Sequence, residues 1–177
     1  YSPTPLSTEE ILLKTENSII KPTLKAMRDK GHPYKGFLYV GIMIVDNNPY
    51  VIEFNVRMGD PETQVVIPMM KNSLLDLIES ALNNKLDSFN YKNKDGYCIT
   101  VVLAAKGYPG YYKKGYAING LDKLGDDLVF HAGTSFDKNN FFITSGGRVL
   151  NVIGFGKTLK LAIKDAYRII NKIGFKN

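Results

Sequence analysis

The chain has one cysteine, two histidines and no tryptophan among its 177 residues. A single cysteine has no disulfide partner, and Cys98 lies at no metal-binding spacing, so we interpret it as a small buried apolar residue. His32 and His131 have no nucleophile or metal ligand at a useful spacing, so we interpret both as structural. This composition excludes a disulfide scaffold and a cysteine–histidine zinc site.

Long apolar runs are also missing. No run approaches the roughly 20 residues that a membrane-crossing helix needs. The first residues are polar and do not resemble a signal peptide. We therefore predict a cytoplasmic protein with no membrane partner.

Acidic residues are the minority, which gives a net charge of +6 and a pI near 9.2. The lysines are scattered, and the nearest approach to a basic and aromatic stripe is Tyr108, Tyr111 and Tyr112 beside Lys113 and Lys114. A basic pI by itself indicates solubility and non-specific attraction to anions. We predict a solvated basic surface and no nucleic-acid partner, although anionic substrates fit the charge equally well.

The most informative residues that are present form the stretch 53–64. On an extended strand side chains alternate between two faces, so Glu53, Asn55 and Arg57 should share one face. Ile52, Phe54 and Val56 should lie on the other face, which is apolar and could seal a core. Hard oxygens from Glu and Asn suit Mg²⁺, and a neighbouring Arg suits a phosphate or carboxylate. The alternative is an amphipathic strand whose Glu and Arg form only a surface pair.

A strand-to-helix turn follows. Gly59 gives the backbone freedom, Asp60 is a good N-cap, and Pro61 suits the first helical position. The positive end of a helix would then emerge beside the polar face of the strand, where it could receive an anion.

These residues resemble a known signature. The run Arg57-Met58-Gly59-Asp60-Pro61-Glu62-Thr63-Gln64-Val65, behind Glu53-Phe54-Asn55, is similar to that of the phosphoribosylamine–glycine ligase (glycinamide ribonucleotide synthetase) family of the ATP-grasp superfamily. Further motifs resemble the same family: Tyr1-Ser2-Pro3, Gly36 to Gly41, Ala105 to Gly110, His131 to Thr134 and Thr144 to Leu150. The resemblance covers essentially the whole chain.

The resemblance implies ATP-dependent ligation of glycine to 5-phosphoribosylamine through glycyl phosphate, giving glycinamide ribonucleotide, ADP and phosphate. It assigns Glu53 and Asn55 to Mg²⁺ (or Mn²⁺) and the phosphates of ATP. It assigns Arg57 to the charge of the transferring phosphoryl group, and Asp60 either to a substrate or only to the helix cap. Many ATP-grasp enzymes carry a first acidic ligand on the preceding strand, where this chain has Gly41.

Because the family enzyme is more than twice as long and the chain begins abruptly at Tyr1, we expect a C-terminal portion, inactive without the upstream N-terminal part of the same enzyme. The alternatives are another ATP-grasp carboxylate–amine ligase or carboxylase, a non-catalytic fragment that packs against a partner, and a basic nucleic-acid binder. Lys106 and Arg148 are weaker candidates for phosphate contacts, because a turn and a solvent-facing strand start explain them as well.

The predicted fold class is α+β, with two domains. Residues 1–96 would be the second half of an ATP-grasp domain, an antiparallel sheet with helices, and residues 97–177 a small, mostly β C-terminal domain with a terminal helix. The expected elements are a capped helix from Ser7 kinked at Pro22, a hairpin of strands 36–45 and 49–56, and helices at 61–70 and 73–84. Strands at 97–105, 128–135, 140–144 and 148–154 and a helix at 158–173, stopped by Gly174, complete the set. The inward residues of the helix at 158–173 would be Leu159, Ala162, Ile163, Ala166, Ile170 and Ile173.

Overall fold

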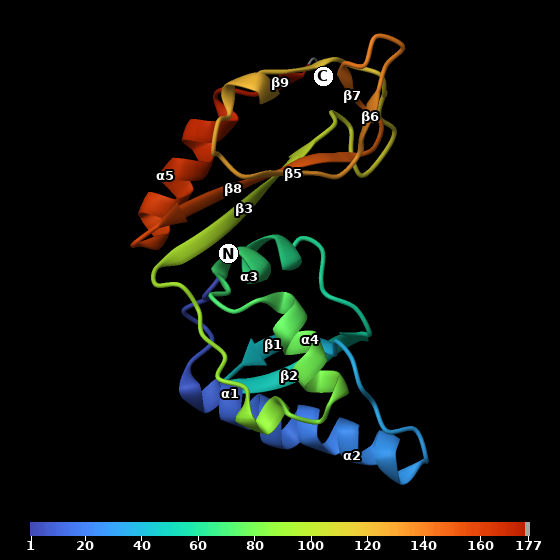
Figure 1. The fold of residues 1–177 in the computed structure, drawn as a ribbon, viewed down its shortest axis with the longest axis vertical. Helices are drawn as coiled ribbons and strands as arrows, with labels where there is room; N and C mark the ends of the chain where they lie inside the picture. The colour runs from blue at the N-terminus through green and yellow to red at the C-terminus, as the bar shows by residue number, and fades with distance from the viewer. Residues whose placement is uncertain (176–177) are drawn as a thin grey trace. The chain divides into compact units, whose positions relative to one another are not determined.

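The computed structural model of the protein describes residues 1–175, which form two compact units (Figure 1). The first, called here the hairpin unit, comprises residues 3–60 and 70–93. The second, called the sheet unit, comprises residues 1–2 and 61–69 and the chain from Lys94 onward. The division therefore places a short segment near residue 65 with the C-terminal part of the chain. The domain boundary between 96 and 97 remains a prediction.

The hairpin unit begins with one long helical segment. It consists of α1 (Glu9–Thr15), a π-helical turn (Glu16–Ile20) and α2 (Lys21–Asp29). Its N-cap is Thr8, whose side chain accepts from the amide of Ile11, and not Ser7 as predicted. Pro22 does not break the segment. In the π-helical turn before it, the amide of Lys21 donates a hydrogen bond to the carbonyl of Glu16. The wider turn accommodates a proline that an α-helix interior would not tolerate.

The predicted hairpin is confirmed. Strands β1 (Tyr39–Val45) and β2 (Asn48–Asn55) pair antiparallel. Asp46 and Asn47 join them with φ of 48° and 57°, the left-handed conformation that Asn and Asp tolerate in a two-residue turn. Helix α1 anchors this turn, since Lys14 donates to the Asn47 carbonyl at 2.8 Å and Asn47 donates to Glu10 at 2.7 Å. Helix α4 (Leu74–Leu82), capped by Ser73, and a 3₁₀ turn (Leu86–Ser88) complete the unit.

The sheet unit is built on a three-stranded antiparallel sheet in the order β3-β8-β5 (Figure 1). These strands are β3 (Tyr97–Ala104), β8 (Arg148–Gly156) and β5 (Val129–His131). Helices α5 (Leu159–Ile170) and α3 (Thr63–Met69) both pack against β3 and β8. The core side chains include Val65 and Met69 from α3 and Cys98 and Ile153 from the sheet. This is the small, mostly β unit with a terminal helix that the sequence predicts.

Shorter elements were predicted less well. The expected strand 128–135 is divided, with β6 (Thr134–Phe136) pairing with β7 (Phe142–Thr144) instead of joining the main sheet. The terminal helix ends at Ile170, and Gly174 lies in β9 (Gly174–Phe175), which pairs with β4 (Ile118–Asn119). On α5, Ala162 and Ala166 are buried as predicted.

Two assignments on α5 are wrong. Ile169 is buried at 1% exposure, whereas the predicted inward residue Ile163 is 39% exposed. The hydrophobic spacing admits either residue, and packing against the sheet selects the first. A 3₁₀ turn (Leu121–Lys123) lies between β4 and β5. Among residues 1–175, no helix combines the length and the apolar character needed to cross a membrane.

Candidate functional site

Glu53 and Asn55 lie together on one face of β2. Their cross-strand partners are Gly41 and Tyr39, whereas Phe54 between them pairs with Val40 on the opposite face. The amide nitrogen of Asn55 donates a hydrogen bond of 2.8 Å to one carboxylate oxygen of Glu53. This bond holds the two side chains side by side and leaves the other Glu53 oxygen and the Asn55 amide oxygen as acceptors.

A bulge beside Glu53 sets the direction of its side chain. Gly41 pairs with Glu53 while the next residue, Ile42, pairs with Val51, so Ile52 has no partner in the register. The regular alternation predicted through Ile52 is therefore interrupted there. A bulge of this kind bends a strand and redirects the side chains next to it, and such bulges are frequent beside active sites.

Gly41 provides the space that Glu53 occupies. A Cβ at position 41 would lie 3.1 Å from Cγ of Glu53, closer than most real Cβ contacts. The position where the sequence resemblance leads us to expect an acidic ligand is thus directly opposite Glu53. A side chain at position 41 would require the Glu53 side chain to shift by a few tenths of an ångström.

Arg57 does not continue the strand. β2 ends at Asn55, one residue before the predicted end, and Arg57 lies in a bend with its guanidinium donating to the Met58 carbonyl at 2.9 Å. Strand alternation therefore does not align Arg57 with Glu53 and Asn55. Its side chain is exposed to solvent.

The predicted helix cap at Asp60 is wrong. Residues 60–62 form a turn, and α3 begins at Thr63. The carbonyl of Glu62 accepts from the amides of Val65 at 3.1 Å and Val66 at 3.0 Å, so the first helical hydrogen bonds start two residues later than expected. The helix has seven residues. Asp60 is exposed in the turn before the helix, and its role toward a substrate stays a prediction.

The paired oxygens of Glu53 and Asn55 fit a hard divalent cation. Mg²⁺ is bound in proteins by one or two side-chain oxygens together with water and substrate phosphates. Within residues 1–175, no group of three or more His, Cys, Asp and Glu side chains is placed to hold a metal on its own. A two-oxygen site completed by phosphates is compatible with both observations.

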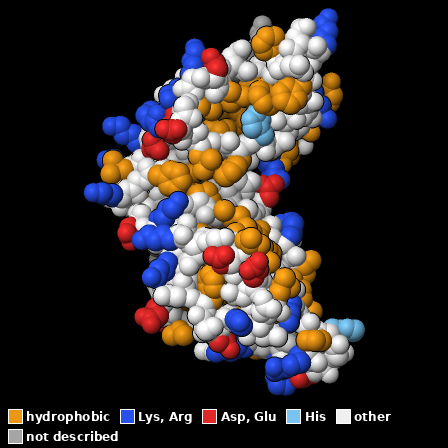
Figure 2. Space-filling view, in the orientation of Figure 1, with side chains coloured by type: hydrophobic (Ala, Val, Ile, Leu, Met, Phe, Trp, Pro, Cys, Tyr) orange, Lys and Arg blue, Asp and Glu red, His pale blue; other side chains and the backbone are white. Residues whose placement is uncertain are grey.

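The apolar side of β2 is uncovered within the described residues. Ile52, Phe54 and Val56 are 63%, 45% and 74% exposed, so in this chain they do not seal a core as the sequence predicts. Figure 2 shows apolar side chains at the surface among the lysines and arginines. We interpret these exposed apolar side chains on and just after β2 as a place where another segment or molecule docks.

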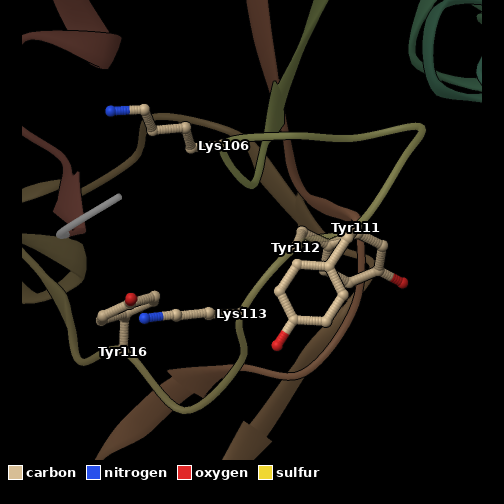
Figure 3. A pocket seen from close by; sticks show the side chains of 5 residues that line it. All are labelled: Lys106, Tyr111, Tyr112, Lys113 and Tyr116. Atoms are coloured by element: carbon tan, nitrogen blue, oxygen red, sulfur yellow. The ribbon is translucent and has the colours of Figure 1, made fainter.

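The remaining sequence candidates lie in the sheet unit. His131 contacts Thr134 through Nδ1 at 2.9 Å and packs against the Phe142 ring at 4.6 Å, which agrees with a structural role. Cys98 is fully buried, and burial raises the pKa of its thiol to about 11. Arg148 opens β8, and Lys106 lines a pocket with three tyrosines (Figure 3). Of these tyrosines, Tyr116 was not recognised in the sequence, because only the chain fold brings it near Lys106.

Comparison with known families gives two matches, separated by residues 64–97. Residues 1–63 match the family described as phosphoribosylglycinamide synthetase, ATP-grasp (A) domain. Residues 98–177 match phosphoribosylglycinamide synthetase, C domain. Together these two parts of one family account for most of the chain.

Individual relatives agree. A phosphoribosylamine–glycine ligase of Caldanaerobacter subterraneus is 43% identical over 99% of this chain and 42% of its own length. One from Escherichia coli is 45% identical over 98% of this chain and 41% of its own length. The crystal structure of phosphoribosylamine–glycine ligase from Thermotoga maritima matches with a TM-score of 0.85 and 33% identity, over 96% of this chain and 41% of that one.

A more distant structure shares only the fold. The Kluyveromyces lactis urea amidolyase has 15% identity and a TM-score of 0.58, over 98% of this chain and 10% of that chain. The chain spans about 42% of the length of curated ligase relatives such as the Caldanaerobacter protein. From the two family matches and these relatives together, the chain belongs to the phosphoribosylamine–glycine ligase family and covers part of its ATP-grasp domain and its C domain.

Proposed function

We propose that the chain is part of an enzyme that ligates glycine to 5-phosphoribosylamine at the expense of ATP, through glycyl phosphate, in purine biosynthesis. The observation that carries this proposal is the pairing of Glu53 and Asn55 on one face of β2, opposite Gly41, in a chain of this family. The products would be glycinamide ribonucleotide, ADP and phosphate. The cytoplasmic location predicted from the sequence belongs to the same proposal.

Glu53 and Asn55 would hold Mg²⁺ or Mn²⁺ against ATP. A bound divalent ion supplies positive charge that neutralises the phosphates. Holding the two side chains together before the nucleotide arrives reduces the ordering needed on binding, and the bond between Asn55 and Glu53 does this. Arg57, exposed just past the strand, would place its guanidinium on the charge of the transferring phosphoryl group. Asp60 would orient a substrate group.

The upstream part of the same enzyme would cover the apolar face of β2. Ile52, Phe54 and Val56 present this face, and burying a side chain of this size contributes about 1.5–3 kcal/mol. A Val56→Ser variant should therefore leave the stability of this chain nearly unchanged, because Val56 is 74% exposed here, while it weakens the complete enzyme by roughly that amount. Thermal unfolding of both forms tests the difference, and equal losses in both would contradict it.

Substrate dependence tests the proposed reaction. The complete enzyme should release ADP only when glycine and 5-phosphoribosylamine are both present, and the product should be glycinamide ribonucleotide. Alanine, which adds one methyl group, serves as the control acid, because a site built for glycine lacks the room. ADP release that is independent of glycine, or equally fast with another carboxylate, would replace this reaction with that of a different ATP-grasp ligase.

A further inference from the structure

A second group of ligand-binding side chains lies in the sheet unit, on the loop between β3 and β4. Every charged residue between Ala105 and Leu121 is a lysine, and the same segment is rich in tyrosine. The residues are Lys106, Tyr108, Tyr111, Tyr112, Lys113, Lys114 and Tyr116. The sequence of this segment therefore concentrates lysines and aromatic rings and contains no acidic residue.

The backbone of this loop is fixed at both ends. At its start the amide of Ala105 donates to the Gly147 carbonyl at 2.7 Å. At its end Tyr116 and the buried Thr144 exchange hydrogen bonds, at 2.8 Å between backbone groups and 3.1 Å from the Tyr116 amide to the Thr144 hydroxyl. Gly107 has φ of +97°, and a Cβ there would lie 2.2 Å from the Tyr111 carbonyl. The two ends of the loop backbone are thus tied to the rest of the sheet unit.

These side chains line a pocket of about 320 Å³, formed by Lys106, Tyr111, Tyr112, Lys113 and Tyr116 (Figure 3). Figure 3 shows the ends of the two lysines on the same side of the loop as the Tyr116 ring. The Tyr112 ring is supported by the edge of Tyr108, with ring centres 6.1 Å apart, and by Lys114, whose Nζ lies 5.8 Å from the ring centre. The volume is at the lower end of the range for small-ligand pockets, about 300–1,000 Å³.

We propose that this pocket binds a mononucleotide, with the base against the tyrosine rings and the phosphate between Lys106 and Lys113. Tyrosine faces stack on any base, and lysine ammonium groups bind phosphate as point charges. A pocket of this size accepts one nucleotide, whereas a nucleic-acid strand needs a groove that runs past several bases. The site goes beyond the proposed ligase reaction, whose ATP is assigned to Glu53 and Asn55 in the hairpin unit.

The test is calorimetric titration of the chain with AMP, with adenosine and ribose 5-phosphate as the two halves of the ligand. AMP should bind, and each half should bind at least tenfold more weakly, because the pocket recognises ring and phosphate together. Lys113→Gln and Tyr116→Ala should each weaken AMP binding at least tenfold. Tyr116→Phe, which keeps the ring, should bind AMP within twofold of the parent chain.

Two further variants are controls for position. Lys138→Gln removes a lysine from the loop between β6 and β7, and Glu53→Gln alters the strand assigned to ATP. Both should bind AMP as the parent does. Circular dichroism of each variant establishes that its fold is retained.

Four outcomes would overturn the proposal. AMP binding that survives Lys113→Gln and Tyr116→Ala would place it elsewhere, and loss in Glu53→Gln would assign it to the ATP strand. Ribose 5-phosphate binding as tightly as AMP would make the pocket a phosphate site without base recognition. An oligothymidylate that binds more tightly than AMP would make it a nucleic-acid surface.

Discussion

Helix α5 packs closely against the sheet at Gly154 on β8. A Cβ at Gly154 would lie 2.3 Å from the carbonyl oxygen of Ala162, 2.5 Å from the amide nitrogen of Ala166 and 2.8 Å from its Cβ. Two of these three atoms belong to the backbone of α5, and both alanines are fully buried. A methyl group at Gly154 therefore cannot be accommodated by the rotation of a side chain. The helix itself has to move.

The expected cost follows from these contacts. Overpacking by one or a few methylene groups costs about 1–3 kcal/mol, and displacing backbone atoms on two turns of α5 places Gly154→Ala near the upper end, about 3 kcal/mol. For a chain of this length about 1 kcal/mol corresponds to roughly 2–4 °C, so the melting temperature should fall by about 6–12 °C. Thermal unfolding followed by circular dichroism measures this change.

Gly174→Ala is the matched control. Gly174 lies in the same unit, and a Cβ there meets no atom within 4 Å. That variant should stay within about 0.5 kcal/mol of the parent chain. If Gly154→Ala were no more destabilising than Gly174→Ala, the close approach of α5 to β8 would be wrong.

Three other variants or treatments test the sheet unit. Thr158 accepts from the Leu161 amide at the start of α5, so Thr158→Ala should cost about 1 kcal/mol in chemical denaturation, whereas Thr158→Ser should not. Hydrogen bonds from Arg168 and Lys172 hold the pKa of Asp127 at about 2, below its usual 3.8. The ionised carboxylate therefore stabilises the fold above pH 3.8, and this stabilisation is lost as the pH falls through 2. The melting temperature of Asp127→Asn should therefore lie below that of the parent at pH 5, and the gap should shrink as the pH falls towards 2 and close below it; a constant gap would contradict the assignment. Because Cys98 is fully buried and its thiol pKa is about 11, thiol reagents should label it only on unfolding, and rapid labelling of the folded chain would refute its burial.

Local rules predicted the elements whose sequence signals are strong. The hairpin was predictable because Asp46 and Asn47 tolerate the left-handed conformation, although the predicted turn also included Asn48, which is the first residue of β2. The alternation around Glu53 placed it with Asn55 on one face. The terminal helix was predictable from its spacing. The choice between Ile163 and Ile169 was not, because it depends on how the helix lies on the sheet.

Other features depend on contacts that local patterns do not contain. Strands β4 and β9 have two residues each, which is too short to show a periodicity, and each forms by pairing with the other. Helix α3 begins only at Thr63, although the residues at Asp60 and Pro61 are typical of a helix start. The apolar face of β2 was read correctly as apolar, but alternation identifies only which side is apolar and not what covers it.

ATP-dependent phosphate release by the complete enzyme, measured with glycine and 5-phosphoribosylamine, tests the central claim most directly. Glu53→Gln and Asn55→Ala should each lower the rate at least about 100-fold, since even groups that only support a metal ligand are worth about 10–100-fold. Glu79→Gln, an exposed acid on α4, should leave the rate unchanged. Full activity in both Glu53→Gln and Asn55→Ala would contradict the account and move the metal site away from β2.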